Sequence, residues 1–509
     1  MKKKLLLGIV LALVLAALAA SAASAADGAK IKELRVGQTS DAITLDPQKF
    51  NDILTANITK QIYNALVKVD SELKIRPDLA KSWENPSNLE WVFHLNQGVK
   101  FHNGEELTAD DVVYTINRIL DPATASSGIA HVRQVEKVEA VDKYTVKITT
   151  KIPFAPLLYS LARYEVAILN EKAVKAGGDT YGQNPVGTGP FKFVEWVRGD
   201  HVTLERWDDY FEGPAKLDRV VYRGIPEDAT RIIELESGGI DLIPANAAAQ
   251  DYLRLKEDKR FKTYETRAQS TLYVFYNVTV PPFDNKLVRQ ALNYAVDSQA
   301  IIDAVYFGIG KPSVGPIADV IFGFDPTLTE EPYPYDPEKA KELLKEAGLP
   351  QGFTCTLYSD TRSARRNVCE LVQAYLMEVG VEVKIELLER GAFLSASSKG
   401  LKGMGLSGWV GTGDGDGALY STYHSSGIGG VNYFYTSIPE LDKAIELGQG
   451  TLDPEKRLPY YKEAQAIINE YAPQIFLLQD YTLALSRSNI EGFKPYPNQI
   501  APLYEVDKQ

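Results

Sequence analysis

Apolar residues recur at helical spacing in several segments of the chain. Between residues 112 and 120 they form one stripe, and Asp111 is placed to close a capping box with Thr108. Two more helices are predicted to begin after Asp336 and Asp453, because each aspartate is followed directly by a proline, which favours the first turn of a helix. These signals predict three helices, the first of them with one apolar face.

Other segments alternate apolar and polar residues, which is typical of half-buried strands. Residues 144–150 and 381–389 show this pattern. The second segment follows a predicted helix over residues 365–379 and a glycine, so helix and strand make one α/β unit. No fixed-period repeat interrupts the alternation of helices and strands. A mixed α/β class is therefore predicted for the whole chain.

Residues 400–430 differ from their surroundings because they are rich in glycine, serine and aspartate. Long glycine-rich loops inside a compact domain usually bind something or stay mobile. Asp414 and Asp416 would offer carboxylates to a ligand ammonium group, and aromatic residues would cover a ligand at low entropic cost. The pattern suits a zwitterionic ligand, although Trp409 is equally compatible with core packing. The aromatic residues are Trp409, Tyr420 and Tyr423.

The N-terminal residues have the layout of a secretory signal peptide. Lys2–Lys4 precede an apolar run that reaches about Ala20, and Ala23-Ser24-Ala25 supplies the small residues of a cleavage site. A membrane anchor is the alternative, but the run is shorter than the ~20 residues of a spanning helix. No cysteine lies nearby to carry a lipid. We expect cleavage after residue 25 and a periplasmic or extracellular protein.

Length and charge narrow the possible functions further. The chain has 509 residues, and about 484 remain once the predicted cleavage removes the first 25. This length exceeds the ~250–300 residues that one hydrophobic core supports, so at least two lobes are expected. The formal net charge is −12 and becomes more negative when three leader lysines are lost, which argues against nucleic-acid binding. The two cysteines, Cys355 and Cys369, either form a disulfide or remain buried thiols.

The chain contains none of the common catalytic motifs. It lacks H-E-x-x-H, G-x-S-x-G, a P-loop and a C-x-x-C pair, and none of its five histidines has metal-ligand spacing from another. A calcium loop around Asp414 and Asp416 would need more acidic ligands and a late glutamate. We therefore expect no catalytic residues, no cofactor and no metal site.

Several motifs, in order along the chain, resemble one known family. They are IYNALVKVD, IRPDLAKSWE, WVFHLNQGVKFHNGEELTADDVVYTINRIL, PVGTGPFKFVEW, FYNVTVPPFDNKLVRQALNYAVD and LDPEKRLPYYKEAQAIINEYAPQIFL. Together they resemble the family 5 extracytoplasmic solute-binding proteins, which serve ABC importers of dipeptides, oligopeptides, glutathione and nickel chelates. The resemblance covers nearly the whole mature chain.

The resemblance implies a monomeric two-lobed α/β fold of the hinged-clamp type, in which the lobes close on a ligand and the closed form docks on a membrane permease. It also implies domain bounds. The signal peptide is 1–25, lobe I is 26–70 with 187–268 and 479–509, its accessory domain is 71–186, and lobe II is 269–478.

The resemblance also implies ligand contacts near Trp409. In dipeptide-binding relatives, an aspartate three residues after the matching tryptophan takes the peptide amino group. Here that position is Thr412, so Asp414 is the candidate replacement, with Asp416 beside it. Arg362 lies where relatives hold a ligand carboxylate with an arginine, although a solvated arginine at a helix start is the alternative. The remaining candidates for ligand contact are Tyr420 and His424.

A short peptide is the predicted ligand, and other ligands on the same fold remain alternatives. His424 and the tyrosines around it would suit a nickel chelate or an oligosaccharide, and the loop after Trp409 resembles that of glutathione- and peptide-binding relatives. A secreted hydrolase is the alternative from another class, but no nucleophile and base can be paired in the sequence.

Overall fold

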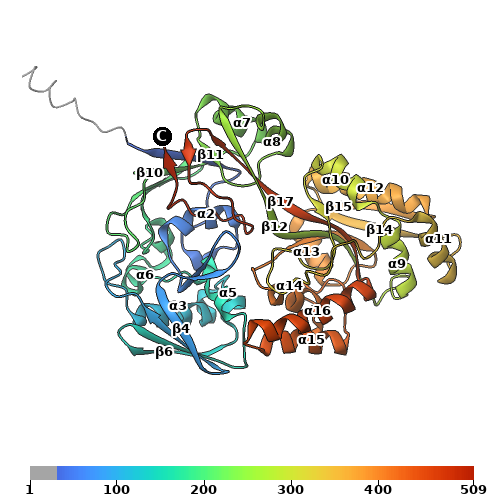
Figure 1. The fold of residues 1–509 in the computed structure, drawn as a ribbon, viewed down its shortest axis with the longest axis horizontal. Helices are drawn as coiled ribbons and strands as arrows, with labels where there is room; N and C mark the ends of the chain where they lie inside the picture. The colour runs from blue at the N-terminus through green and yellow to red at the C-terminus, as the bar shows by residue number, and fades with distance from the viewer. Residues whose placement is uncertain (1–30) are drawn as a thin grey trace, which may run out of the picture.

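Two lobes are connected by two long antiparallel strands, β12 (Phe261–Tyr276) and β17 (Gln474–Arg487) (Figure 1). The computed structural model describes residues 31–509, so the predicted signal peptide lies outside the described residues. We call the part with β1–β11 and the segment after β17 the first lobe, and the part with β13–β16 and α9–α16 the second lobe. Within residues 31–509, no helix is both long enough and apolar enough to cross a membrane.

One 11-stranded sheet runs through both lobes. The connecting strands β12 and β17 lie in its middle and join the strands of the second lobe to those of the first. Its order is β15-β14-β16-β12-β17-β11-β1-β10-β9-β8, with β13 beside β17. β14 lies parallel to both β15 and β16. The other bounds are β1 Glu33–Gln38, β8 Phe191–Val197, β9 His201–Arg206, β10 Arg219–Gly224, β11 Leu242–Ile243, β13 Lys311–Pro312, β14 Phe353–Asp360, β15 Val381–Leu388 and β16 Met404–Val410.

The first lobe contains a second, antiparallel sheet of four strands in the order β4-β5-β7-β6. This sheet and helix α3 enclose their own apolar core, separate from the core around β1 and β10. Alternation over residues 144–150 predicted β7, and the structure confirms it. The bounds are β2 Val67–Val69, β3 Ile75–Pro77, β4 Ala80–Ser87, β5 Glu90–Leu95, β6 Val135–Asp142 and β7 Thr145–Thr150, and the short pair near the C-terminus is β18 Ile490–Glu491 and β19 Asp507–Lys508.

The three helices whose starts were predicted begin directly after their capping residues. In α3, Thr108 and Asp111 form the predicted capping box. Asp336 and Asp453 cap α11 and α16 by accepting hydrogen bonds from backbone N–H groups. The helices are α2 Ile53–Ile62, α3 Ala109–Leu120, α4 Ile129–Val132, α5 Leu157–Leu161, α6 Glu171–Gly177, α7 Asp228–Ser237, α8 Ala249–Leu255, α9 Lys286–Tyr294, α10 Ser298–Tyr306, α11 Pro337–Glu346, α12 Ser363–Glu378, α13 Arg390–Ser398, α14 Gly415–Tyr423, α15 Pro439–Gly450 and α16 Pro454–Tyr471.

The interpretation of residues 400–430 as one long loop is wrong, because this segment contains strand β16 and helix α14. β16 pairs with β12 over seven residues. Its glycines serve close packing: a Cβ on Gly405 would lie 2.3 Å from the Phe275 ring. A glycine in a strand often marks a place where another group approaches the backbone closely. The sequence alone does not show whether such a glycine lies in a strand or in a loop.

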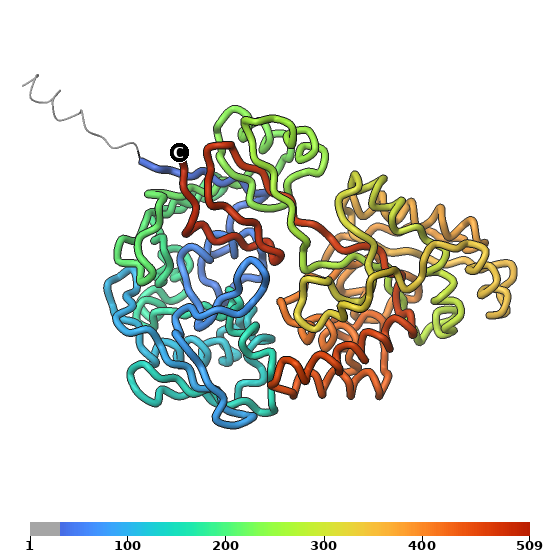
Figure 2. The backbone as a smooth tube through the Cα atoms, viewed as in Figure 1, coloured from blue at the N-terminus to red at the C-terminus, as the bar shows by residue number. Residues whose placement is uncertain are grey.

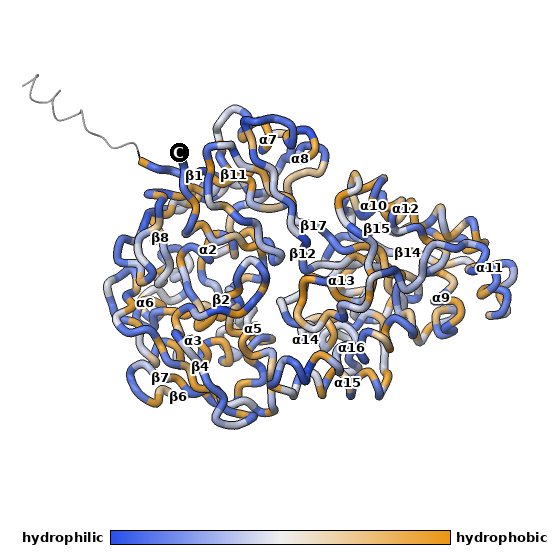
Figure 3. The backbone as a smooth tube through the Cα atoms, in the orientation of Figure 1, coloured by the Kyte–Doolittle hydropathy of each residue, from blue (hydrophilic) through white to orange (hydrophobic). Residues whose placement is uncertain are grey.

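The connecting strands change register between the lobes. β12 pairs with β17 from Phe261 to Arg267 and again from Thr271, with a break in the register between them. Figure 2 shows β12 and β17 passing side by side from one lobe to the other. In Figure 3 the middle portions of β12 and β17 are white to blue, which marks intermediate to hydrophilic residues, whereas hydrophobic segments, in orange, occur within each lobe. A break in pairing between two separate cores is a natural hinge.

The cysteines resolve an alternative that the sequence left open. Cys355 on β14 and Cys369 on α12 are free thiols. Both pack in the apolar core between α12 and the sheet, and burial raises the pKa of each thiol to about 12. The pair is therefore two free thiols, Cys369 buried and Cys355 partly buried, that pack as apolar side chains rather than a disulfide.

Candidate functional site between the lobes

A small cavity lies where the lobes meet. It holds about 30 Å³, and it is lined by the first-lobe residues Tyr159, Arg163 and Tyr164 together with Gln269 of β12 and Thr412 of the second lobe. Tyr164 stacks on Phe50, with ring centroids 5.3 Å apart. We call this space the interlobe cavity. Its walls combine aromatic faces with hydrogen-bonding groups, as small-molecule sites commonly do.

The lobes also touch directly beside this cavity. The backbone N–H of Ala155 donates to the carbonyl oxygen of Gln449 at 2.9 Å. The Arg133 guanidinium of the first lobe lies 5.1 Å from the centre of the Tyr420 ring. Since α14 and α15 carry the second-lobe partners, these two helices form the surface that meets the first lobe. The lobes are thus closed against each other on this side.

Asp414 is a predicted ligand residue that the structure places inside the second lobe. Its side chain is fully buried, and its two oxygens accept hydrogen bonds from Arg457 at 2.8 and 2.9 Å. It also caps α14 by accepting from the N–H of Asp416. Arg457 donates further to Tyr461 and to the Gly448 carbonyl oxygen. The Asp414 carboxylate therefore already has a full set of donors.

Asp416 is buried next to this ion pair. Both of its oxygens accept from Gln449 Nε2, at 3.0 and 3.1 Å. Burial, with the neighbouring Asp414 charge, raises the pKa of Asp416 to about 7, although Gln449, Arg457 and Arg133 oppose the rise. Burial disfavours the charged form of an acid. Together, Asp414 and Asp416 hold the start of α14 in place at the lobe interface.

Trp409 lies near the end of strand β16, and Thr412 lies on the connection from β16 to α14. Trp409 is half-buried opposite Thr271 of β12 and packs on the core below α14. Its indole N–H is buried, and no acceptor among residues 31–509 lies within hydrogen-bond distance. Thr412 is the one of the seven predicted ligand residues that is among the lining residues of the interlobe cavity.

Tyr420 and His424 occupy the other end of α14. Their rings stack with centroids 4.4 Å apart. His424 is buried, with Nδ1 2.8 Å from the Ser426 hydroxyl oxygen and Nε2 3.3 Å from a Glu446 oxygen. No cluster of three or more metal-binding side chains is found among residues 31–509. His424 therefore supports the end of α14, and Tyr420 contacts the first lobe through Arg133.

Arg362 lies apart from α14, immediately before helix α12. Its Nε donates to Asp360 at 2.9 Å, and about half of its side-chain surface stays exposed. Near it, Asp480 on β17 has a pKa raised to about 6 by burial, which Arg365 and Arg362 partly offset. Arg365 donates to the Leu406 carbonyl oxygen at 2.8 Å. This charged cluster spans β17 and α12 in the second lobe.

Sequence reasoning missed the first-lobe wall of the interlobe cavity. Tyr159, Arg163 and Tyr164 come from a short segment around α5 that carries no motif. Arg163 is oriented by Glu165, which accepts from its guanidinium at 2.9 Å. No spacing rule connects this segment with Thr412, about 250 residues further along the chain. Only the folded chain brings them together.

Comparisons with known proteins agree with this architecture. Residues 74–430 match the model of the bacterial extracellular solute-binding proteins, family 5. The glutathione-binding protein GsiB of Pectobacterium atrosepticum is 33% identical over 491 residues, which cover 94% of this chain and 94% of that protein. Heme-binding protein A of Haemophilus influenzae is 34% identical, with coverages of 88% and 87%.

A solved structure shows the same fold. The periplasmic binding protein DppA of Helicobacter pylori, in complex with the peptide STSA, superposes with a TM-score of 0.81 at 29% identity. The superposition covers 94% of this chain and 98% of that one. The two-lobed α/β architecture predicted from the sequence is thereby confirmed.

Proposed function

Because the chain belongs to the bacterial extracellular solute-binding proteins of family 5, we propose that it captures a short peptide between its lobes and delivers it to the permease of an ABC importer. The observation that carries this proposal is the interlobe cavity, whose wall is shared by Thr412, Gln269 and the segment around Tyr164. A site built from both lobes couples ligand binding to lobe closure.

Opening of the lobes is part of this proposal. The interlobe cavity holds about 30 Å³, whereas sites for small-molecule ligands measure about 300–1,000 Å³. A peptide therefore enters when the lobes separate about β12 and β17. The register break between Arg267 and Thr271 is the natural place for that motion.

We assign different roles to the predicted ligand residues. Thr412 and Trp409 contact the ligand directly, and Arg362 is available for a ligand carboxylate because about half of its side-chain surface is exposed. Asp414 and Asp416 act indirectly by fixing the start of α14. Tyr420 and His424 act at the lobe contact and at the end of α14.

Further features of the proposal follow from the family and the sequence. Family members are substrate-binding proteins, so we propose a binding protein rather than an enzyme. It acts as a monomer in the periplasm after cleavage at residue 25, and it does not bind nucleic acid because its net charge is −12. The proposed domains are 26–70 with 187–268 and 479–509, the accessory domain 71–186, and 269–478.

Calorimetry with short peptides and glutathione tests this function. Thr412→Phe places a bulky ring in the interlobe cavity, so we expect affinity to fall at least tenfold. Thr354→Phe, at an exposed position of β14, is the matched control and should bind as the wild type does. Unchanged affinity in Thr412→Phe would contradict binding between the lobes. Hydrolysis of a peptide by the wild-type protein would favour the enzyme alternative.

A further inference from the structure

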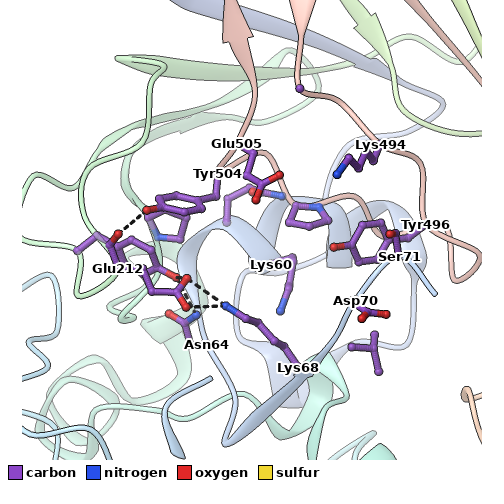
Figure 4. A pocket seen from close by; sticks show the side chains of 16 residues that line it. Lys60, Asn64, Lys68, Asp70, Ser71, Glu212, Lys494, Tyr496, Tyr504 and Glu505 are labelled. Carbon is purple, nitrogen blue, oxygen red and sulfur yellow. Dashed lines mark hydrogen bonds and ion pairs between the residues drawn. The ribbon is translucent and has the colours of Figure 1, made fainter. Parts of the chain in front are cut away.

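A larger pocket opens in the first lobe, beside helix α2. It has a volume of about 550 Å³ and is lined by Lys60, Lys68, Asp70, Glu212, Lys494 and Tyr496, among others. Figure 4 shows Lys60 pointing from α2 into the middle of this pocket, beneath the C-terminal segment that carries Lys494 and Tyr496. We call it the lysine pocket. Its volume lies within the range of ligand sites.

The charged groups around the lysine pocket are mostly paired. Lys68 Nζ donates to both oxygens of Glu212, at 2.8 and 3.0 Å. Asp70 accepts from Arg76 Nε at 2.7 Å. The buried Asp78 carboxylate, behind the pocket, accepts from Asn64 and from a backbone N–H. Glu505 and Lys494 are exposed at the rim and are solvated.

Lys60 differs from these groups. Its side chain is half-buried, and among residues 31–509 no acceptor lies within hydrogen-bond or ion-pair distance of its Nζ. Burial lowers the pKa of Lys60, and the charges of Asp78 and Glu212 oppose this only from a distance. Placing a cation out of water without a partner costs free energy. Such a group is retained where something else supplies the missing anion.

The lysine pocket continues toward the interlobe cavity. A small inner cavity of about 40 Å³ shares Lys60 and Tyr496 with the lysine pocket. The same inner cavity shares Arg163, Tyr164 and Asn498 with the interlobe cavity. The three spaces are thus neighbours, in order from the lobe interface to Lys60.

We propose that the lysine pocket is a subsite for a carboxylate of the bound peptide, with the Lys60 ammonium as its partner. The unpaired Nζ, the pocket volume and the shared walls carry this inference, and it rests on the proposed function. A carboxylate there gains a charge-assisted hydrogen bond in a partly desolvated site. Tyr496, on the walls of both cavities, covers the ligand on the way.

Peptide libraries with and without a free carboxyl group test this subsite. We would titrate the wild-type protein with a tripeptide library that has free C-termini and with the same library amidated. The wild type should bind the free-acid library at least tenfold more tightly. Lys60→Met should lose that preference while its affinity for the amidated library changes less than twofold. Lys60→Arg keeps the charge and should restore the preference.

Lys81→Met is the matched control, because it removes one lysine charge from an exposed site on β4. It should behave as the wild type. Thermal unfolding of Lys60→Met should show no loss of stability, which excludes misfolding as the cause of weak binding. If the wild type binds both libraries equally, or if Lys60→Met keeps the preference, the subsite is refuted and peptide capture stands. If neither library binds the wild type, the proposed function fails and the subsite with it.

Discussion

In the second lobe the Asp414 carboxylate is surrounded by donors, whereas in the first lobe no acceptor among residues 31–509 lies within hydrogen-bond distance of the Lys60 ammonium. The Asp414 side chain is fully buried, and the Lys60 side chain is half-buried. Asp414 accepts two hydrogen bonds from Arg457 and one from the backbone of α14. Lys60 has no such partner among residues 31–509.

This difference separates structural charges from charges available to a ligand. A buried charge whose partners are all internal holds the fold together, and removing it leaves its partner uncompensated. A buried charge without an internal partner weakens the fold slightly and gains its partner from outside. The following variants test that distinction, beginning with the largest expected effect.

Asp414→Asn should destabilise the second lobe strongly. The substitution leaves the buried Arg457 guanidinium without a counter-charge, and breaking a buried pair in this way costs about 3–5 kcal/mol. Chemical denaturation monitored by circular dichroism measures the loss. Asp336→Asn, at the cap of α11, is the control and should cost less than about 1 kcal/mol. Equal losses in the two variants would show that Asp414 acts only as a helix cap.

Asp416 should make stability depend on pH. Its pKa is about 7 in the folded protein against an ordinary value of 3.8, so the folded state holds more protons between these values. The free energy of unfolding therefore falls as pH rises from about 4 to 7, by up to about 1.4 kcal/mol per pH unit. Asp416→Asn should flatten this part of the profile. Thermal melts at several pH values measure it, and an unchanged slope would mean that Asp416 titrates normally.

Arg133→Ala should weaken the contact between the lobes. The guanidinium lies over the Tyr420 ring, and an exposed contact of this type contributes about 0.5–1 kcal/mol. Because closure and binding are coupled, peptide affinity should fall about two- to fivefold. Calorimetry measures this change, with Arg254→Ala on the outer surface of α8 as control. A larger loss of peptide affinity in Arg254→Ala than in Arg133→Ala would show that the contact between Arg133 and Tyr420 does not control lobe closure.

Lys60→Met should have the smallest effect on stability, and its sign is opposite to that of Asp414→Asn. Removing an unpaired, half-buried ammonium group leaves the melting temperature unchanged or raises it slightly. Differential scanning fluorimetry in the absence of ligand measures this temperature. A clear fall in the melting temperature would mean that Lys60 has an internal role, which would remove the contrast with Asp414.

The sequence predicted those parts of the fold that depend on neighbouring residues. The capping box at Thr108 and the caps at Asp336 and Asp453 act within one turn of a helix, so the start of each helix could be read directly. The alternation that predicted β7 and β15 is equally local. The family motifs added the two-lobed arrangement.

The candidate site depends on contacts that are distant in the sequence. Gly405 looked like a loop residue because the Phe275 ring that requires a glycine lies on another strand. Asp414 looked available to a ligand because its partner Arg457 comes 43 residues later. Lys60 sits in the last turn of α2, where a lysine is ordinary. Its missing partner is visible only in the folded protein.

Native mass spectrometry of the purified protein tests the central claim most directly. Capture of a peptide between two closing lobes predicts a complex heavier than the polypeptide by the mass of a short peptide. Denaturation should release that peptide for sequencing. A protein that carries the bare polypeptide mass, and that shows no mass increase when short peptides are added, would contradict the claim.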